Sequence, residues 1–437
     1  MNHAGETTVV AGDISIAIGT IHKVRNRLIP LLFLLYLVAF LDRTNIGFAA
    51  LTMNADLAIT RTQFGLLTGI FFWGYCLFEI PSNLLLHRIG ARTWIARILL
   101  SWGMVAVLTG FVHNAPQLYA ARFLLGVAEA GYFPGILLYL TYWFRRREQA
   151  RMIALFMAAI PVSNILGSPL SGWILDHVHW LGVASWRWLL ILEGLPAIVG
   201  GLTTYLLLPS RPAEAAFLMA QEKDWIAAAL AEEKRQKLDE KQLSTWRALA
   251  NTRVWHLACI SFTYQVATYA IFFWMPQAVK SLSDYSNTTV GILVMIPHLA
   301  GLVAMIFVSR SSDHRLERRY HAAVPLVVGG IALILLGTTN SPWLSVTLWC
   351  FANFGNYGFE GPFWSLPSDF LAGSAAAAGI ALVTSFGSLG GFVGPSIVGA
   401  AGTGTGGIYR GLAIAGLSFF ASASLALMLP KKARSTA

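Results

Sequence analysis

The chain has 437 residues, of which 56% are hydrophobic and only 12% charged, with a formal net charge of +10. A soluble chain carries about a quarter charged residues, and a water-soluble core of this size cannot hide so much apolar surface. The composition therefore excludes a soluble enzyme and predicts a protein embedded in the lipid bilayer. The basic excess does not indicate a nucleic-acid partner, because Lys and Arg stand in short clusters between apolar runs.

Twelve apolar runs approach or exceed the length of about 20 residues that crosses a bilayer. They lie near residues 28–52, 62–86, 93–112, 117–142, 150–174, 186–208, 253–279, 288–310, 322–338, 343–368, 376–399 and 408–429. These runs predict an all-α integral membrane protein with about twelve transmembrane helices.

A polar segment interrupts the apolar runs in the middle of the chain. Part of it, at 213–241, alternates Ala and Leu with Glu, Lys and Arg, which predicts amphipathic helix on the membrane surface. The segment divides the helices into six plus six. The expected parts are a tail at 1–27, a six-helix bundle at 28–208, a linker at 209–252, a second six-helix bundle at 253–429 and a tail at 430–437.

The basic residues occupy alternate connections between the apolar runs. Besides the middle segment, the clusters are at 23–27, 88–92, 145–147, 310–319 and 431–434. Basic residues accumulate on the cytoplasmic side of membrane proteins. We therefore expect a multi-pass protein of the cell inner (plasma) membrane with both termini and the linker in the cytoplasm.

Two short strings recur at a nearly constant offset in the two halves. TQFGLL at 62–67 matches TTVGIL at 288–293, which is 226 residues further on, and GSPLSG at 167–172 matches GPSIVG at 394–399 after 227 residues. Parallel six-helix repeats around a central site are the architecture of the major facilitator superfamily. The repeats predict that architecture here.

Ionisable side chains inside the apolar runs are candidates for function, because each costs at least about 2.5–3.5 kcal/mol in hydrocarbon. Asp42 and Arg43 lie about 21 Å into the first run at a rise of about 1.5 Å per residue. Arg122 and Glu129 are seven residues apart and share one helix face. A guanidinium grips a carboxylate with two donors, and a buried carboxylate can bind and release a proton. Together the four suffice for proton-coupled transport of an anion.

Other ionisable residues in the runs are interpreted differently. Glu79, Glu193 and Asp369 lie near helix ends or loops and are expected to be structural partners. His298 is expected to form a hydrogen bond between helices. Glu360 is also a buried candidate, and no role is assigned to it.

Four strings resemble the anion:cation symporter family, a branch of the major facilitator superfamily that includes bacterial tartrate, galactonate, glucarate and phthalate carriers. The strings are LDRTNIGFA at 41–49, EIPSNLLL at 79–86, ARFLLGVAEAGYFPG at 121–135 and LEGLPA at 192–197. The resemblance extends over nearly the whole chain. It implies that Asp42 and Glu129 carry protons, that Arg43 and Arg122 bind the substrate carboxylate, and that Tyr75 lines the site.

The chain departs from this family in its eleventh apolar run. It reads TSFGSLGG at 384–391, so that Thr384 and Ser388 stand where tartrate-type relatives commonly have amides. Hydroxyls in these positions leave the identity of the anion open. Further residues are predicted to line the substrate site with Tyr75: Asn164, Gln265, Tyr269, Asn356, Trp364, Ser385 and Ser388.

These observations predict proton-coupled uptake, by alternating access, of a small organic anion such as a sugar acid or a hydroxy-dicarboxylate like tartrate. We expect a monomer that needs no cofactor and holds no metal, because no zinc spacing, phosphate loop or catalytic cluster is recognisable. A proton-coupled exporter of the same fold is the main alternative, and a membrane sensor that does not transport is another. The exact anion, the number of protons and the oligomeric state stay open.

Overall fold

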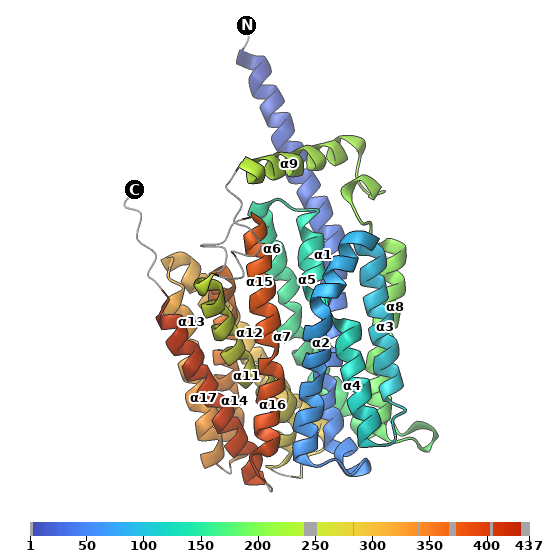
Figure 1. Ribbon diagram of the computed structural model, residues 1–437, viewed down its shortest axis with the longest axis vertical. Coiled ribbons are helices and arrows are strands. Elements are labelled where there is room, and N and C mark those ends of the chain that lie inside the picture. Colours follow the sequence, from blue (N-terminus) through green and yellow to red (C-terminus); the bar gives the residue numbers. More distant parts are fainter. Residues whose placement is uncertain are drawn as a thin grey trace.

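The structure is a computed structural model that describes residues 3–239, 251–282, 284–339, 341–366, 373–402 and 405–429. Nearly all of these residues are helical, and no strand occurs among them. Long helices run roughly side by side through the molecule, and α1 begins toward the same end at which α17 ends (Figure 1). The all-α class predicted from the apolar runs is confirmed.

The first half contains eight α-helices. They are α1 (His3–Asp56), α2 (Arg61–Ile89), α3 (Ala91–Thr109), α4 (Ala115–Glu129), α5 (Tyr132–Thr141), α6 (Arg146–Met157), α7 (Ala159–His177) and α8 (Ser185–Leu207). α4 and α5 form one crossing that is interrupted at Gly131, which has a left-handed backbone (φ 82°). α6 and α7 likewise form one crossing. The first half therefore crosses the bundle six times.

The linker contributes one described helix, α9, and the second half again crosses the bundle six times. The helices are α9 (Ala220–Asp239), α11 (Thr252–Lys280), α12 (Asn287–Arg315), α13 (Arg319–Leu335), α14 (Pro342–Ser365), α15 (Gly373–Ser388), α16 (Gly390–Ala400) and α17 (Thr405–Leu427). α15 and α16 together form one crossing. Short 3-10 turns occur at Trp180–Gly182, Pro212–Glu214 and Leu336–Thr338.

Eleven spans in the described part of the chain are long and apolar enough to cross a membrane. α14 is the twelfth crossing and has 24 residues, but its mean hydropathy is lowered by polar residues that include Asn353, Asn356 and Glu360. α1 begins at His3 and so continues through the segment that the sequence predicts to be a tail. The twelve predicted crossings are present.

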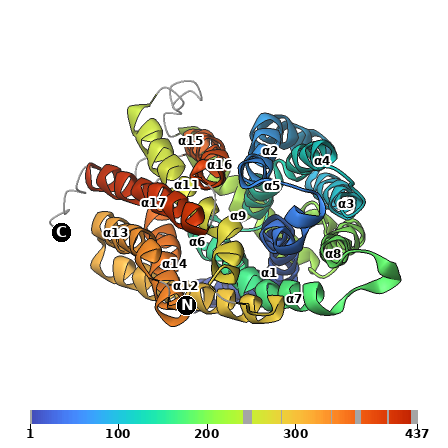
Figure 2. The ribbon, with the colours of Figure 1, turned by 90° about the horizontal axis from the view of Figure 1, so that it is seen from below.

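The crossings form two bundles. α1 packs on α7 and α8, α3 on α8, and α2 on α4 in the first half, while α11 packs on α15, α16 and α17, and α13 on α14 and α17 in the second. The view along the helices shows the two groups, with α2, α3, α4 and α8 on one side and α13, α15 and α17 on the other (Figure 2). The bundles meet through α7 with α12, α2 with α16, and α1 with α11.

The bundles touch closely at the end of the molecule far from α9, which we call the closed end. Four glycines there approach carbonyl oxygens of the opposite bundle so closely that a methyl group would overlap them: Gly65 at Pro395, Gly172 at Asn287, Gly291 at Ser168 and Gly399 at Arg61. Small residues permit such helix contacts in membranes. The contacts come in two pairs that match the internal repeat, because α2 with α16 corresponds to α12 with α7.

One side chain reinforces this contact across the bundles. Asp176, near the end of α7, accepts hydrogen bonds from the backbone N–H groups of Asn287 (3.1 Å) and Thr288 (2.7 Å) and from both of their side chains. It therefore caps the first turn of α12, whose N–H groups have no partner within the helix.

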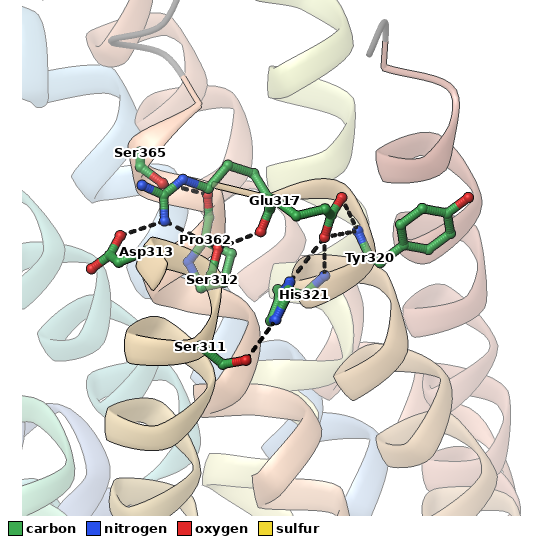
Figure 3. A network of polar contacts seen from close by, with 9 residues as sticks. Ser311, Ser312, Asp313, Glu317, Tyr320, His321, Pro362 and Ser365 are labelled. Atoms are coloured by element: carbon green, nitrogen blue, oxygen red, sulfur yellow. Dashed lines mark hydrogen bonds and ion pairs between the residues drawn. The ribbon is translucent and has the colours of Figure 1, made fainter. Parts of the chain in front are cut away.

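The opposite end, which we call the linker end, carries α9 and the basic connections. Lys23 Nζ of α1 pairs with Glu222 Oε1 of α9 at 2.6 Å. Figure 3 shows the turn between α12 and α13, where Glu317 accepts hydrogen bonds from the N–H groups of Tyr320 (2.9 Å) and His321 (3.2 Å). Partial burial alone would raise the pKa of Glu317, but these hydrogen bonds and one with the His321 ring lower it below its ordinary value.

Candidate functional site

A cavity lies between the two bundles, on the linker side of their closed contact. Side chains from α1, α2, α5, α6 and α7 of the first bundle and from α11, α14 and α15 of the second line it. In α2 and α11 the lining residues lie around the middle of the helix, between 71 and 79 and between 261 and 272. The position between two repeats fits a site reached alternately from either side.

Aromatic rings make up more than half of the cavity lining. Phe72 of α2 and Tyr269 of α11 pack together across the bundles with ring centroids 4.4 Å apart, and Phe40 and Phe272 meet at 6.4 Å. Both pairs bridge the two bundles. The aromatic lining residues are Tyr36, Phe40, Phe71, Phe72, Tyr75, Phe133, Tyr264, Tyr269, Phe272, Phe363 and Trp364.

Arg43 supplies the positive charge of the cavity wall. Its guanidinium forms an ion pair with Glu129 of α4 and donates a hydrogen bond to the Tyr269 hydroxyl at 3.3 Å. The guanidinium carbon also lies 5.2–5.5 Å from the ring centroids of Phe40, Phe71 and Tyr75. Arg43 therefore faces both the cavity and a buried carboxylate.

Glu129 and Arg122 lie behind this wall and not on it. Both are only 2% exposed. The Arg122 guanidinium packs 5.1 Å from the centroid of Phe71, the ring that also contacts Arg43. Its Nε and Nη2 atoms have no hydrogen-bond partner within the described part of the chain. Buried donors without partners are uncommon and call for a functional explanation.

Asp42 points away from the cavity, into the first bundle. It is 2% exposed, and its Oδ1 accepts a hydrogen bond from the Asn45 side chain at 3.4 Å. Adjacent residues on a helix point in directions about 100° apart. Asp42 and Arg43 therefore share a depth but face different surroundings.

Half of the residues predicted for the site line the cavity, and the other half lie behind it. Those on the lining are Arg43, Tyr75, Gln265, Tyr269, Trp364 and Ser388. Asn164 instead donates a hydrogen bond to the Tyr357 hydroxyl at 3.5 Å, and Asn356 accepts one from Thr268 at 2.7 Å. Ser385 donates to Glu79, which does line the cavity. The structure also contains the predicted hydrogen bond between helices at His298, with the Tyr357 hydroxyl at 3.0 Å.

Sequence reasoning missed two carboxylates of the cavity lining. Glu79 was interpreted as a structural partner, and Glu360 was left without a role, yet both face the cavity. Tyr264 donates a hydrogen bond to Glu360 Oε1 at 3.2 Å, while the buried Oε2 has no partner among the described residues. The available signal was the spacing of Glu360 four residues after Asn356, which places two polar groups on one face of α14.

The described residues contain no group of three or more His, Cys, Asp or Glu side chains placed to hold a metal ion. Polar groups that converge from two bundles on an aromatic cavity, in a fold of twelve crossings, define a membrane transporter of the two-bundle type.

Comparison with known proteins identifies the family. The model of the Major Facilitator Superfamily matches residues 32–395, and the chain belongs to this superfamily. A provisionally named tartrate transporter of Agrobacterium vitis is 41% identical over 98% of this chain and 94% of its own length. A quinolone resistance transporter of Acinetobacter baumannii is 36% identical over 90% of each chain. The predicted resemblance to organic-anion transporters of this superfamily is confirmed.

A solved structure supports the fold independently. It is the inward-facing, unoccupied form of a bacterial homologue of the human lysosomal transporter Spinster, with a TM-score of 0.76 and 16% identity over 92% of this chain and 96% of that one. At this identity the similarity concerns the fold alone.

Proposed function

We propose that the protein takes up a small organic anion together with protons, by symport and alternating access. The observation that supports this most strongly is the position of Arg43, whose guanidinium lines the cavity while it is paired with the buried Glu129. One cation thus serves two carboxylates, one from the protein and one from the substrate.

The shared cation couples the proton to the anion. Leaving one partner of a buried ion pair uncompensated costs about 3–5 kcal/mol. An ionised Glu129 therefore keeps Arg43 engaged. When Glu129 takes a proton, the guanidinium becomes free for the substrate carboxylate, and the total charge of the site changes little. Loss of that proton restores the Arg43–Glu129 pair and displaces the anion.

The basic clusters support an orientation of the protein in the membrane. We assign the linker end and both termini to the cytoplasm, because Lys and Arg accumulate on that side. The cavity is then on the cytoplasmic side of the closed contact, as in the inward-facing step of the cycle. Protons would enter from outside, where each positive charge that moves inward gains about 2.3 kcal/mol per 100 mV.

The cavity favours a hydroxylated monocarboxylate, such as a sugar acid. The Thr384 hydroxyl donates to the carbonyl oxygen of Ile380 (3.0 Å), and Ser388 donates to that of Thr384 (2.9 Å). Their protons are therefore used within their own helix. Glu79 and Glu360 remain as acceptors for substrate hydroxyls, and they would repel a second substrate carboxylate.

A hydroxy-dicarboxylate such as tartrate is the second candidate. Two observations favour it: the name of the Agrobacterium vitis relative, and the unpartnered donors of Arg122 beside the Phe71 ring. Movement of Phe71 would be needed for Arg122 to reach a second carboxylate.

Transport assays on the purified protein in liposomes test the proposal. A pH gradient, acidic outside, should drive accumulation of one labelled sugar acid, and counterflow should occur without the gradient. Uptake that is insensitive to the gradient would contradict proton symport. Substrate efflux coupled to inward proton movement would instead favour an exporter, as the name of the quinolone resistance relative suggests. Binding without counterflow would favour a sensor.

A further inference from the structure

Two carboxylates lie close together inside the first bundle, outside the cavity lining. Asp42 of α1 is 2% exposed and Glu193 of α8 is 3% exposed. Asn45, one turn beyond Asp42, donates to Asp42 Oδ1 at 3.4 Å, and its amide also faces Glu193. Ser171 of α7 donates to Glu193 Oε1 at 2.7 Å. The remaining oxygens, Asp42 Oδ2 and Glu193 Oε2, are buried and have no partner in the described part of the chain.

Positive charge is scarce around this pair. α8 packs against α1, α3 and α7. α1 presents Asp42 and Asn45 to Glu193, and α7 presents Ser171. On α3, Arg97 donates a hydrogen bond to the Ser101 hydroxyl, and its guanidinium stacks on the Trp94 ring.

The other nearby arginines are also engaged elsewhere. On α8 itself, Arg187 is bound to the carbonyl oxygens of Gly110 and Val112. Arg43 forms an ion pair with Glu129. The positive charge of Arg122 interacts electrostatically with both Glu129 and Asp42. Three carboxylates therefore share two guanidinium groups. Since an isolated buried carboxylate prefers to be neutral, at least one of the three holds a proton.

The positions along the helices give this arrangement a direction. At about 1.5 Å per residue, Asp42 lies about 21 Å before the end of α1, Glu193 about 12 Å after the start of α8, and Ser171 about 9 Å before the end of α7. All three of these helix termini are at the closed end. Inside this bundle, Asp42, Glu193 and Ser171 therefore lie progressively closer to the closed end.

We infer that Glu193 is a proton-binding residue of the transport cycle, which passes protons between the closed end and Asp42 along a route separate from the substrate cavity. In the transfer, the O–H bond of the Glu193 carboxyl breaks and an O–H bond forms on the Asp42 carboxylate. The ionised Glu193 is then stabilised by the Ser171 hydroxyl that already donates to it. This inference rests on the proposed proton symport. It adds Glu193, which does not line the substrate cavity, to the residues that carry protons.

Glu193→Gln tests the inference because the amide keeps the shape and cannot release a proton. We expect counterflow of the substrate at close to the wild-type rate, whereas uptake driven by a pH gradient falls by about 100-fold or more, the usual contribution of a proton-transfer group. Glu193→Asp keeps a titratable group and should restore part of the uptake with a displaced pH profile. Glu222→Gln, on the linker helix, is the matched control and should leave both assays unchanged.

Wild-type uptake and an unchanged pH profile in Glu193→Gln would overturn the inference and leave the proposed function standing. Equal losses of counterflow and uptake in both Glu193 variants, with a lowered melting temperature, would assign Glu193 to stability and also overturn it. If the wild-type protein itself ignores the pH gradient, the proposed function fails first, which distinguishes the two failures.

Discussion

The two bundles share a scaffold but not a chemistry. The interface glycines occupy matching positions in both halves, and the contacts of α2 with α16 and of α12 with α7 repeat each other. The buried ionisable groups are distributed unequally. The first bundle holds Asp42, Arg43, Glu79, Arg122, Glu129 and Glu193, whereas the second has Glu360 and His298 among its described buried or cavity-lining residues.

One pair of positions makes the difference concrete. Tyr269 follows Arg43 by 226 residues, the offset of the internal repeat, and the two side chains meet through a hydrogen bond. The same place in the fold thus carries a cation in one half and a phenol in the other. The repeat thus preserves the glycine contacts between the bundles, while most of the described buried ionisable groups lie in the first bundle and Glu360 is the carboxylate that the second bundle contributes to the cavity lining.

The largest expected effect is on coupling in the first bundle. Glu129→Gln mimics the protonated carboxyl, so Arg43 is permanently available to the anion. We expect substrate exchange to persist and uphill uptake driven by a pH gradient to be lost. Both assays are measured on the same reconstituted sample, with the melting temperature as the folding control. A structural role would instead destabilise the protein by about 3–5 kcal/mol and abolish both activities.

The second expected effect compares the two related positions directly. Arg43→Lys keeps the charge but loses the planar fork that reaches Glu129 and Tyr269 together, so the dissociation constant should rise by about 100-fold. Tyr269→Phe removes the hydroxyl that accepts one hydrogen bond from the guanidinium and should cost about tenfold. Titration calorimetry on the two variants measures both values. An equal rise of the dissociation constant in both variants would show that the cation of the first bundle contributes no more to binding than the phenol of the second.

The third expected effect concerns selectivity in the second bundle. Glu360→Gln removes a negative charge from the cavity wall while it keeps an acceptor for substrate hydroxyls. The ratio of hydroxy-dicarboxylate to sugar-acid uptake should rise by about tenfold. The dependence of uptake on the pH gradient should not change. Competition assays with unlabelled acids measure the ratio, and loss of proton coupling in this variant would place part of the charge chemistry in the second bundle.

The sequence was sufficient to predict the crossings because the bilayer imposes a length on every helix that spans it. It also predicted that Asp42 and Arg43 lie inside the first crossing, and both are within α1. Which of the two faces the cavity depends on how α1 rotates against α7, α8 and α11, and that packing is not encoded in the spacing of residues along one helix. Asn164 and Asn356 illustrate the same limit, since both lie deep but bond to neighbouring helices.

The two missed carboxylates have a related explanation. Glu79 is near the linker end of α2 by sequence, and a carboxylate near a helix end is commonly a structural partner. It lines the cavity beside the second bundle, and Ser385 of α15 donates a hydrogen bond to it, an arrangement that only the two halves together reveal. Glu360 belongs to α14, which is not among the eleven described spans that are apolar enough to cross a membrane, and its polar residues include this carboxylate on the cavity lining.

The smallest expected effect is at the linker end, where the halves differ in how corresponding helices begin. In the first turn of α13 two N–H groups donate to the Glu317 carboxylate, whereas in the first turn of α3 the Arg92 N–H donates to the neutral Ser210 hydroxyl at 3.4 Å. Glu317→Gln should therefore lower the free energy of unfolding by about 1 kcal/mol or less, since the side chain is 31% exposed.

The pH dependence of this cap gives the sharper form of the prediction. Because the pKa of Glu317 is lower in the folded protein than the ordinary value of 4.5, its stabilisation is fully present above that value and is lost as the pH falls through the folded pKa. The wild-type melting temperature should therefore decline more steeply with acidification than that of Glu317→Gln. Glu232→Gln, on α9 and paired with Arg235 of the same helix, is the control. Parallel curves for wild type and Glu317→Gln would mean that the carboxylate charge contributes nothing to the start of α13, and that the two halves begin these helices with equal stability.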